Sequence, residues 1–191
     1  MRRSLVLAAF LVVSVVGCGS ESKDAGPPPP PPPPTLPATA LPDLDSRSRT
    51  LDVEALAEDA LERDELADLL SEAGFENGSE REFSGRTKTF DHVIARSLRF
   101  DSEDGADSYL GWLGKHGDDI LGAADSAQVT PLGESSVAYT LARCGTCKKE
   151  LPTFLAGWRR GAVVLTLLAA GSGGNVDRFD ALARELDAVL G

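Results

Sequence analysis

The sequence predicts an α+β domain in which a mainly antiparallel sheet is covered by helices. Three amphipathic stretches repeat their apolar residues at helical spacing, and the stretches between them alternate or carry short apolar runs, as strands do. Neighbouring predicted strands are joined by short turns, which favours antiparallel pairing. The predicted order is α-β-β-α-β-β-β-α, in a single domain that covers residues 50–191.

The first half of this domain is predicted to contain a helix and two strands. The helix covers residues 53–73, where apolar residues recur on one face, and Gly74-Phe75 is a typical helix end. A strand is expected around Arg81–Phe83. Further extended structure begins near Thr87 and includes the alternating stretch His92–Phe100.

The second half is predicted to contain a helix, three strands and a final helix. Asp101 or Ser102 is placed to cap the helix over residues 103–121, whose glycines weaken it. The other expected elements are an extended piece at Gln128-Val129, a strand over Ser135–Arg143, a hairpin of Thr153–Trp158 and Ala162–Ala169, and a last helix capped by Asn175. Gly161 supplies the positive φ that the hairpin turn needs.

The first 18 residues have the pattern of a secretory signal peptide. Arg2 and Arg3 precede an apolar run, Leu5–Val13, which is shorter than the ~20 residues that span a bilayer. The run leads into Val15-Val16-Gly17-Cys18, which resembles a bacterial lipobox. In proteins with that motif the cysteine is lipidated on its sulfur and becomes the first residue of the mature chain.

The lipobox resemblance implies a lipoprotein anchored in a lipid membrane through Cys18 and facing the extracytoplasmic side of the cell envelope. Residues 1–17 would be the signal peptide, and stable attachment requires two or more acyl chains such as palmitate. An ordinary signal peptide that happens to contain a cysteine is the alternative.

A disordered, proline-rich linker is predicted between the anchor and the domain, over residues 18–49. It contains eight consecutive prolines, Pro27–Pro34, each of which lacks a backbone N–H donor and has a fixed φ. The run therefore forms a polyproline II helix about 25 Å long. We interpret it as a spacer, and a ligand for a proline-binding groove of another protein is the alternative.

The net charge of −11 argues against some classes of partner. Nucleic-acid binding requires basic patches, so the acidic balance argues against it, and it also argues against docking on anionic headgroups. Paired carboxylates fall on predicted helix faces, where their charge is solvated. We therefore expect no nucleic-acid partner, no metal site and no cofactor.

The most distinctive chemical motif is Cys144-Gly145-Thr146-Cys147. It resembles the redox motif of thioredoxin-like proteins, and by that resemblance Cys144 would be the nucleophile and Cys147 the resolving thiol. A structural disulfide fits the neighbourhood better, because the preceding stretch alternates like an antiparallel strand and no proline follows Pro152. Metal binding by the pair is the third possibility, although both histidines lie far away in the sequence.

Other candidate residues have an ordinary structural interpretation. His92 is expected on a strand face and His116 in a solvated loop. Gly171-Ser172-Gly173-Gly174 precedes a helix, as phosphate-binding loops do, but it lacks their lysine and is interpreted as a flexible connection. Four aromatic residues could line a ligand pocket, with core packing as the simpler expectation: Tyr109, Trp112, Phe154 and Trp158.

Three further stretches are distinctive: Ala73-Gly74-Phe75, Asp101–Ala106 and Trp158–Val164. In these stretches the domain resembles the small α+β domains of bacterial cell-envelope lipoproteins that lack an assigned activity. This resemblance implies a non-enzymatic binding or scaffold domain with an unidentified protein or small-molecule partner. The alternative is an envelope thiol-disulfide oxidoreductase that uses Cys144 and Cys147. A helix over Lys148–Ala156 would favour this enzyme, and a strand there would favour the structural disulfide.

Overall fold

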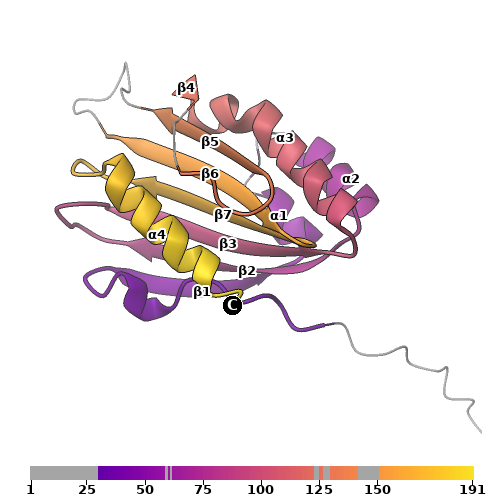
Figure 1. The fold of residues 1–191 in the computed structure, drawn as a ribbon, viewed down its shortest axis with the longest axis horizontal. Coiled ribbons are helices and arrows are strands. Elements are labelled where there is room, and N and C mark those ends of the chain that lie inside the picture. The colour runs from indigo at the N-terminus through magenta and orange to yellow at the C-terminus, as the bar shows by residue number, and fades with distance from the viewer. Residues whose placement is uncertain (1–29, 59, 61, 123–124, 127–129, 142–150) are drawn as a thin grey trace, which may run out of the picture.

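A computed structural model describes residues 30–58, 60, 62–122, 125–126, 130–141 and 151–191 of the chain. These residues form a seven-stranded antiparallel sheet with helices on both faces (Figure 1). The strands are β1 (Asp45–Leu51), β2 (Phe75–Ser84), β3 (His92–Phe100), β4 (Asp125–Ser126), β5 (Ser136–Leu141), β6 (Thr153–Arg160) and β7 (Val163–Ala170). The helices are η1 (Ala38–Ala40), α1 (Val53–Glu58), α2 (Arg63–Glu72), α3 (Glu103–Leu121) and α4 (Val176–Ala188). The predicted α+β class is confirmed.

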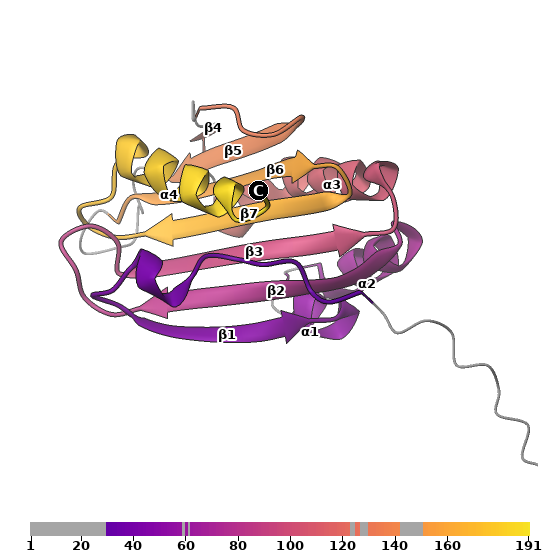
Figure 2. The same ribbon diagram turned by 60° about the horizontal axis from the view of Figure 1, so that its bottom comes forward.

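The sheet separates two layers of other elements. Its strand order is β1-β2-β3-β7-β6-β5-β4. The helix α4 and residues 30–44 lie on one face, and α1, α2 and α3 lie on the other (Figure 2). Each face has its own apolar core. Phe83, Trp158 and Phe179 belong to the core beneath α4, and Leu51, Leu70 and Leu98 belong to the core beneath α1–α3.

The edge strand β1 lies in the stretch that the sequence assigns to the linker. It pairs with β2 from Asp45↔Ser84 to Leu51↔Gly78. Upstream of it, Leu36 is fully buried, and the Thr35 hydroxyl donates a hydrogen bond to the Ala95 carbonyl at 3.2 Å. The predicted domain boundary at residue 50 therefore falls inside the sheet. Because most of β1 is exposed at the sheet edge, its residues are polar, and its composition resembles that of a linker.

The predicted first helix is two helices. The α1 helix begins after Asp52, whose carboxylate accepts a hydrogen bond from the Ala55 amide at 2.8 Å. The break between α1 and α2 allows Leu56 and Leu66 to contact the same apolar core. The prediction that extended structure begins near Thr87 is wrong, because β3 begins only at His92. Residues 85–91 form a loop in which the Thr87 amide donates to the Asp91 carboxylate at 3.1 Å, so side chains replace a strand partner.

The second half of the domain follows the prediction closely. Ser102 caps α3 by accepting a hydrogen bond from the Gly105 amide at 3.2 Å, and Asn175 caps α4 by accepting one from Arg178 at 3.0 Å. Gly161 has a φ of 55° in the turn between β6 and β7. The extended piece expected at Gln128-Val129 lies outside the described residues. In the part of the chain that the structure describes, no helix is long and apolar enough to cross a membrane.

Candidate functional site

All three cysteines of the predicted anchor and disulfide lie outside the described residues. Cys18 belongs to the N-terminal segment that precedes residue 30. Cys144 and Cys147 fall in the sequence between Leu141, where β5 ends, and Thr153, where β6 begins. Leu141 and Thr153 are themselves cross-strand partners. The described part of Lys148–Ala156 is thus extended from Thr153 onward.

The two histidines lie apart, and each is next to a carboxylate. His92 Nε2 lies 3.0 Å from Glu82 Oε1 on the neighbouring strand, as expected for a strand-face residue. The loop position expected for His116 is wrong. It lies within α3 with its ring centroid 4.9 Å from that of Trp112, and its side chain is only 12% exposed. Among the described residues, no group of three or more His, Cys, Asp or Glu side chains is arranged to hold a metal ion.

The glycine-rich stretch before α4 packs tightly against another backbone segment. A Cβ atom on Gly173 would lie 1.8 Å from the Lys88 carbonyl oxygen, and one on Gly171 would lie 2.3 Å from that of Thr89. Glycine is therefore required here because residues 88–90 approach so closely. The interpretation as a flexible connection is corrected accordingly.

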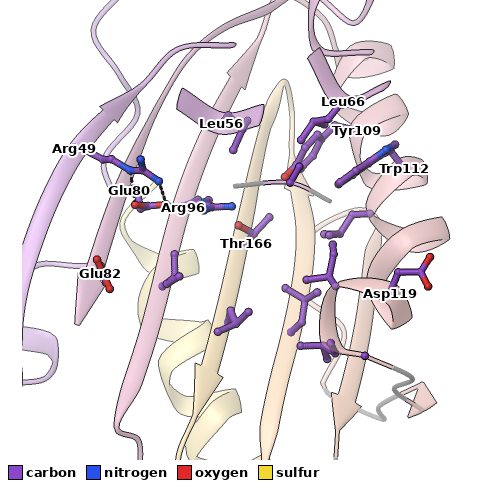
Figure 3. Close-up of a pocket in the computed structure, with 18 of the residues that line it drawn as sticks. Arg49, Leu56, Leu66, Glu80, Glu82, Arg96, Tyr109, Trp112, Asp119 and Thr166 are labelled. Atoms are coloured by element: carbon purple, nitrogen blue, oxygen red, sulfur yellow. Dashed lines mark hydrogen bonds and ion pairs between the residues drawn. The ribbon is translucent and has the colours of Figure 1, made fainter. Parts of the chain in front are cut away.

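A groove of about 1020 Å³ opens on the sheet face that carries α1, α2 and α3 (Figure 3). Its floor is formed by β1, β2, β3, β7 and β6, and α3 forms its longest wall. The groove is lined by Arg47, Ser48, Arg49, Leu56, Ala60, Leu66, Glu80, Glu82, Ile94, Arg96, Tyr109, Trp112, Leu113, Asp119, Ile120, Leu121, Gly122, Leu155, Thr166 and Leu168. Pockets for small molecules typically measure about 300–1000 Å³, so this groove has room for one.

A row of polar side chains crosses the floor of the groove. Arg49 on β1 is paired with Glu80 on β2, Glu80 with Arg96 on β3, and Arg96 with Thr166 on β7. Cross-strand partners point to the same side of a sheet, so all four side chains face the groove.

Different rows lie on either side of this polar row. Toward the helices, the row Leu51, Gly78, Leu98 and Val164 is covered by the apolar core. On the other side, the row Arg47, Glu82, Ile94 and Leu168 lines the open groove. The polar row therefore marks where the helical cover of the sheet ends.

Glu80 is the centre of an ionic row that consists of Arg49, Glu80 and Arg96. Its two oxygens accept hydrogen bonds from Arg49 Nε at 2.7 Å and from Arg96 Nε at 2.6 Å, and the residue is only 5% exposed. Burial opposes ionisation, but the hydrogen bond from Arg49 and the charge of Arg96 outweigh it and hold the pKa of Glu80 below its ordinary value of 4.5. One carboxylate thus bridges two guanidinium groups across three neighbouring strands.

Two of the four aromatic residues singled out from the sequence line the groove. The Tyr109 hydroxyl points into the groove, and burial raises the pKa of this phenol although the charge of Arg96 acts in the opposite sense (Figure 3). Tyr109 therefore stays protonated and can donate a hydrogen bond. Trp112 stacks on Tyr109 at 6.1 Å between centroids. Phe154 and Trp158 instead belong to the core beneath α4, as core packing predicts.

The charged half of the groove was not identified from the sequence. The prediction places Arg47 and Arg49 in the linker, and Glu80 just before a strand without assigning it a role. The alternation Ser46-Arg47-Ser48-Arg49 is the signal that could have indicated a strand, because it repeats every two residues.

A smaller cavity of about 570 Å³ lies on the opposite face of the sheet. Leu41–Leu44, the loop at residues 86–90 and the α4 residues Arg178, Ala181, Leu182 and Glu185 line it. It shares no lining residue with the groove.

Comparisons with known proteins bear on the fold. No protein-family model matches the chain, and no curated protein sequence matches it. The structure is similar to the crystal structure of the extracellular domain of PknH from Mycobacterium tuberculosis, with a TM-score of 0.53 and 12% sequence identity. The match covers 77% of this chain and 84% of that chain. At this identity the similarity concerns the fold alone.

Proposed function

We propose that the protein is a lipid-anchored, extracytoplasmic binding protein that holds a ligand in the groove. The observation that carries this proposal is the open groove of about 1020 Å³, which combines an apolar wall with a few placed polar groups. This combination is typical of small-molecule sites. The similarity of the fold to an extracellular domain supports an extracytoplasmic location.

The anchor in this proposal is Cys18, followed by the proline-rich spacer. The Cys18→Ser variant of the full chain is expected to move from the membrane fraction to the soluble fraction, because an unacylated chain lacks the ~0.8 kcal/mol that each buried CH₂ contributes to membrane binding. Fractionation followed by immunoblotting measures this distribution. The Cys144→Ser variant is the matched control and should stay with the membrane. Retention of Cys18→Ser in the membrane fraction would contradict the anchor.

The competing hypothesis is a thiol-disulfide oxidoreductase that uses Cys144 and Cys147. This hypothesis predicts a helix after the two cysteines, because a nucleophilic cysteine of that class lies at the start of a helix. Here Thr153–Ala156 belongs to β6 and pairs with β5. The extended conformation supports a structural disulfide, and we retain the non-enzymatic function.

The groove can be tested with Nile red, a neutral apolar dye that becomes fluorescent when it leaves water. The protein for this test is the chain from residue 18 with Cys18→Ser, which carries no lipid. We expect saturable binding, and we expect the Ile94→Trp substitution in the groove floor to abolish it by filling the space. The measurement is a fluorescence titration, with thermal unfolding of each variant to verify that it is folded.

The matched control places the same side chain in the other cavity. Ala181→Trp adds a tryptophan to the exposed α4 position that lines the smaller cavity, and it should leave the dye affinity unchanged. The groove would be the wrong site if Ala181→Trp removed binding and Ile94→Trp did not. Absence of saturable binding to the parent chain would contradict the proposed function.

A further inference from the structure

The groove has two chemically different ends. At the β1–β3 end, three arginines and two glutamates lie on neighbouring strands: Arg47, Arg49, Arg96, Glu80 and Glu82. At the other end, the floor is apolar, and the α3 wall is apolar apart from Asp119. Resting on the proposed function, we infer that the groove binds a single-chain amphiphile with an anionic head group, the head at the arginine end and the chain along the apolar end.

The charges at the first end favour an anion. Both oxygens of Glu80 are engaged by Arg49 and Arg96, so this carboxylate is already neutralised. Glu82 lies opposite Arg47 in the sheet, but its carboxylate contacts His92 at 3.0 Å instead. Within the described part of the chain, Arg47 has no hydrogen bond and no ion pair. The guanidinium of Arg47 is therefore the group at this end with which an anionic head group would form a charge-assisted hydrogen bond.

Neutral donors stand beside these charges. The Tyr109 hydroxyl points into the groove, and Thr166 continues the polar row next to Arg96 (Figure 3). Among the described residues, neither hydroxyl has a hydrogen-bond partner. Both can donate to a carboxylate or phosphate oxygen of the head group.

The other end of the groove suits a hydrocarbon chain. Ile94, Leu168 and Leu155 follow one another across β3, β7 and β6 in a single row of the floor. The α3 residues Leu113, Ile120 and Leu121 form the wall next to them. Ile120 is 38% exposed, whereas most large apolar side chains of the described residues are buried. Its side chain is therefore accessible to a ligand that enters the groove. Covering these side chains with a chain of CH₂ groups would contribute about 0.8 kcal/mol per buried CH₂.

The experiment compares amphiphiles that share one chain and differ in their head group. Undecanoate, decyl phosphate, decanol and decyltrimethylammonium, each with a ten-carbon chain on its head group, are titrated below their micellar concentrations into the unlipidated chain from residue 18, and calorimetry gives each affinity. Undecanoate or decyl phosphate should bind at least about tenfold more tightly than decanol, because a charge-assisted hydrogen bond is lost with the neutral head. The first two ligands have the same chain on a carboxylate and on a phosphate, so the ratio of their affinities identifies the preferred head group.

A charge reversal at the exposed end of the groove tests the placement of the head. Arg47→Glu should weaken binding of the anionic amphiphile about tenfold and leave decanol binding unchanged. The matched control is Arg63→Glu on α2, an exposed arginine that does not line the groove. Since neither arginine is buried, both variants should fold, and thermal unfolding verifies this.

The outcomes separate this inference from the proposed function. Equal affinities for all four head groups, or a preference for the cationic one, would overturn the anionic head while leaving the groove as a binding site. Equal effects of Arg47→Glu and Arg63→Glu would overturn the placement of the head. If none of these amphiphiles binds while Nile red does, the ligand class is wrong. If Nile red also fails to bind, the proposed function fails too.

Discussion

Replacing Glu80 by glutamine is expected to lower the free energy of unfolding by about 3 kcal/mol at neutral pH. Glutamine has nearly the same shape, but it leaves Arg49 and Arg96 next to each other without the carboxylate between them. The expected value lies at the low end for a broken buried ion pair because Arg49 is 40% exposed and keeps part of its hydration. Chemical denaturation of parent and variant measures the difference.

The matched control for this change is Glu82→Gln, two residues along the same strand. Glu82 is 42% exposed, and among the described residues its carboxylate forms an ion pair with His92 alone, so this variant should lose less than about 1 kcal/mol. If both variants lost the same free energy of unfolding, the ionic row would stabilise the sheet no more than an exposed ion pair does.

The effect of Glu80→Gln should also depend on pH, with a defined sign. Because the folded-state pKa of Glu80 is depressed, its carboxylate contributes stability above its unfolded value of 4.5, and this contribution is lost as pH falls through the folded pKa. The difference between parent and variant should therefore shrink as the solution is acidified. A difference that stayed constant from neutral pH into strong acid would show that the loss arises from packing rather than from charge.

Replacing Leu36 by alanine is expected to lower the free energy of unfolding by about 3 kcal/mol. Leu36 is fully buried in the core beneath α4, although the sequence places it in the linker. Removing most of its side chain leaves a cavity that the surrounding rigid sheet fills only in part. Thermal or chemical unfolding measures the loss.

Two controls accompany the Leu36 prediction. Leu151→Ala changes the same side chain at a position that is 37% exposed, and it should lose less than about 1 kcal/mol. A chain that starts at Pro30 should unfold like the longer one, whereas a chain that starts at Thr50 lacks most of β1 together with Leu36 and Leu44 and should be strongly destabilised. Equal stability of these two truncated chains would refute the structural role of residues 30–49.

The elements that the sequence predicts best are those with both an apolar pattern and a local end signal. The sequence predicts α3 at its observed bounds, with Asp101 or Ser102 marking its start, and the structure shows that Ser102 is the cap. It predicts the hairpin of β6 and β7 because Gly161 marks the turn. The β1 strand has neither signal. Its pairing with β2 crosses about thirty residues of chain, and its side chains are polar because it lies at the sheet edge.

The groove could not be predicted in the same way, because it depends on the register of strands that are far apart in the sequence. Arg49, Glu80, Arg96 and Thr166 form one row only when β1, β2, β3 and β7 pair as observed. A shift of one residue in any pairing would turn that strand's side chains to the opposite face. The sequence indicates Tyr109 and Trp112 as possible pocket residues, but it does not reveal that a groove lies between α3 and the strands of the sheet.

The most direct test of the groove as a binding site is an amide chemical-shift map of the isotope-labelled, unlipidated chain, titrated with decanol and then with undecanoate. We predict shifts at Ile94, Arg96, Thr166 and Leu168 and along α3, with the larger changes at Arg47 and Arg96 for undecanoate. Shifts that cluster around Ala181 and the loop at residues 86–90, or no shifts on the groove floor with either compound, would contradict the account.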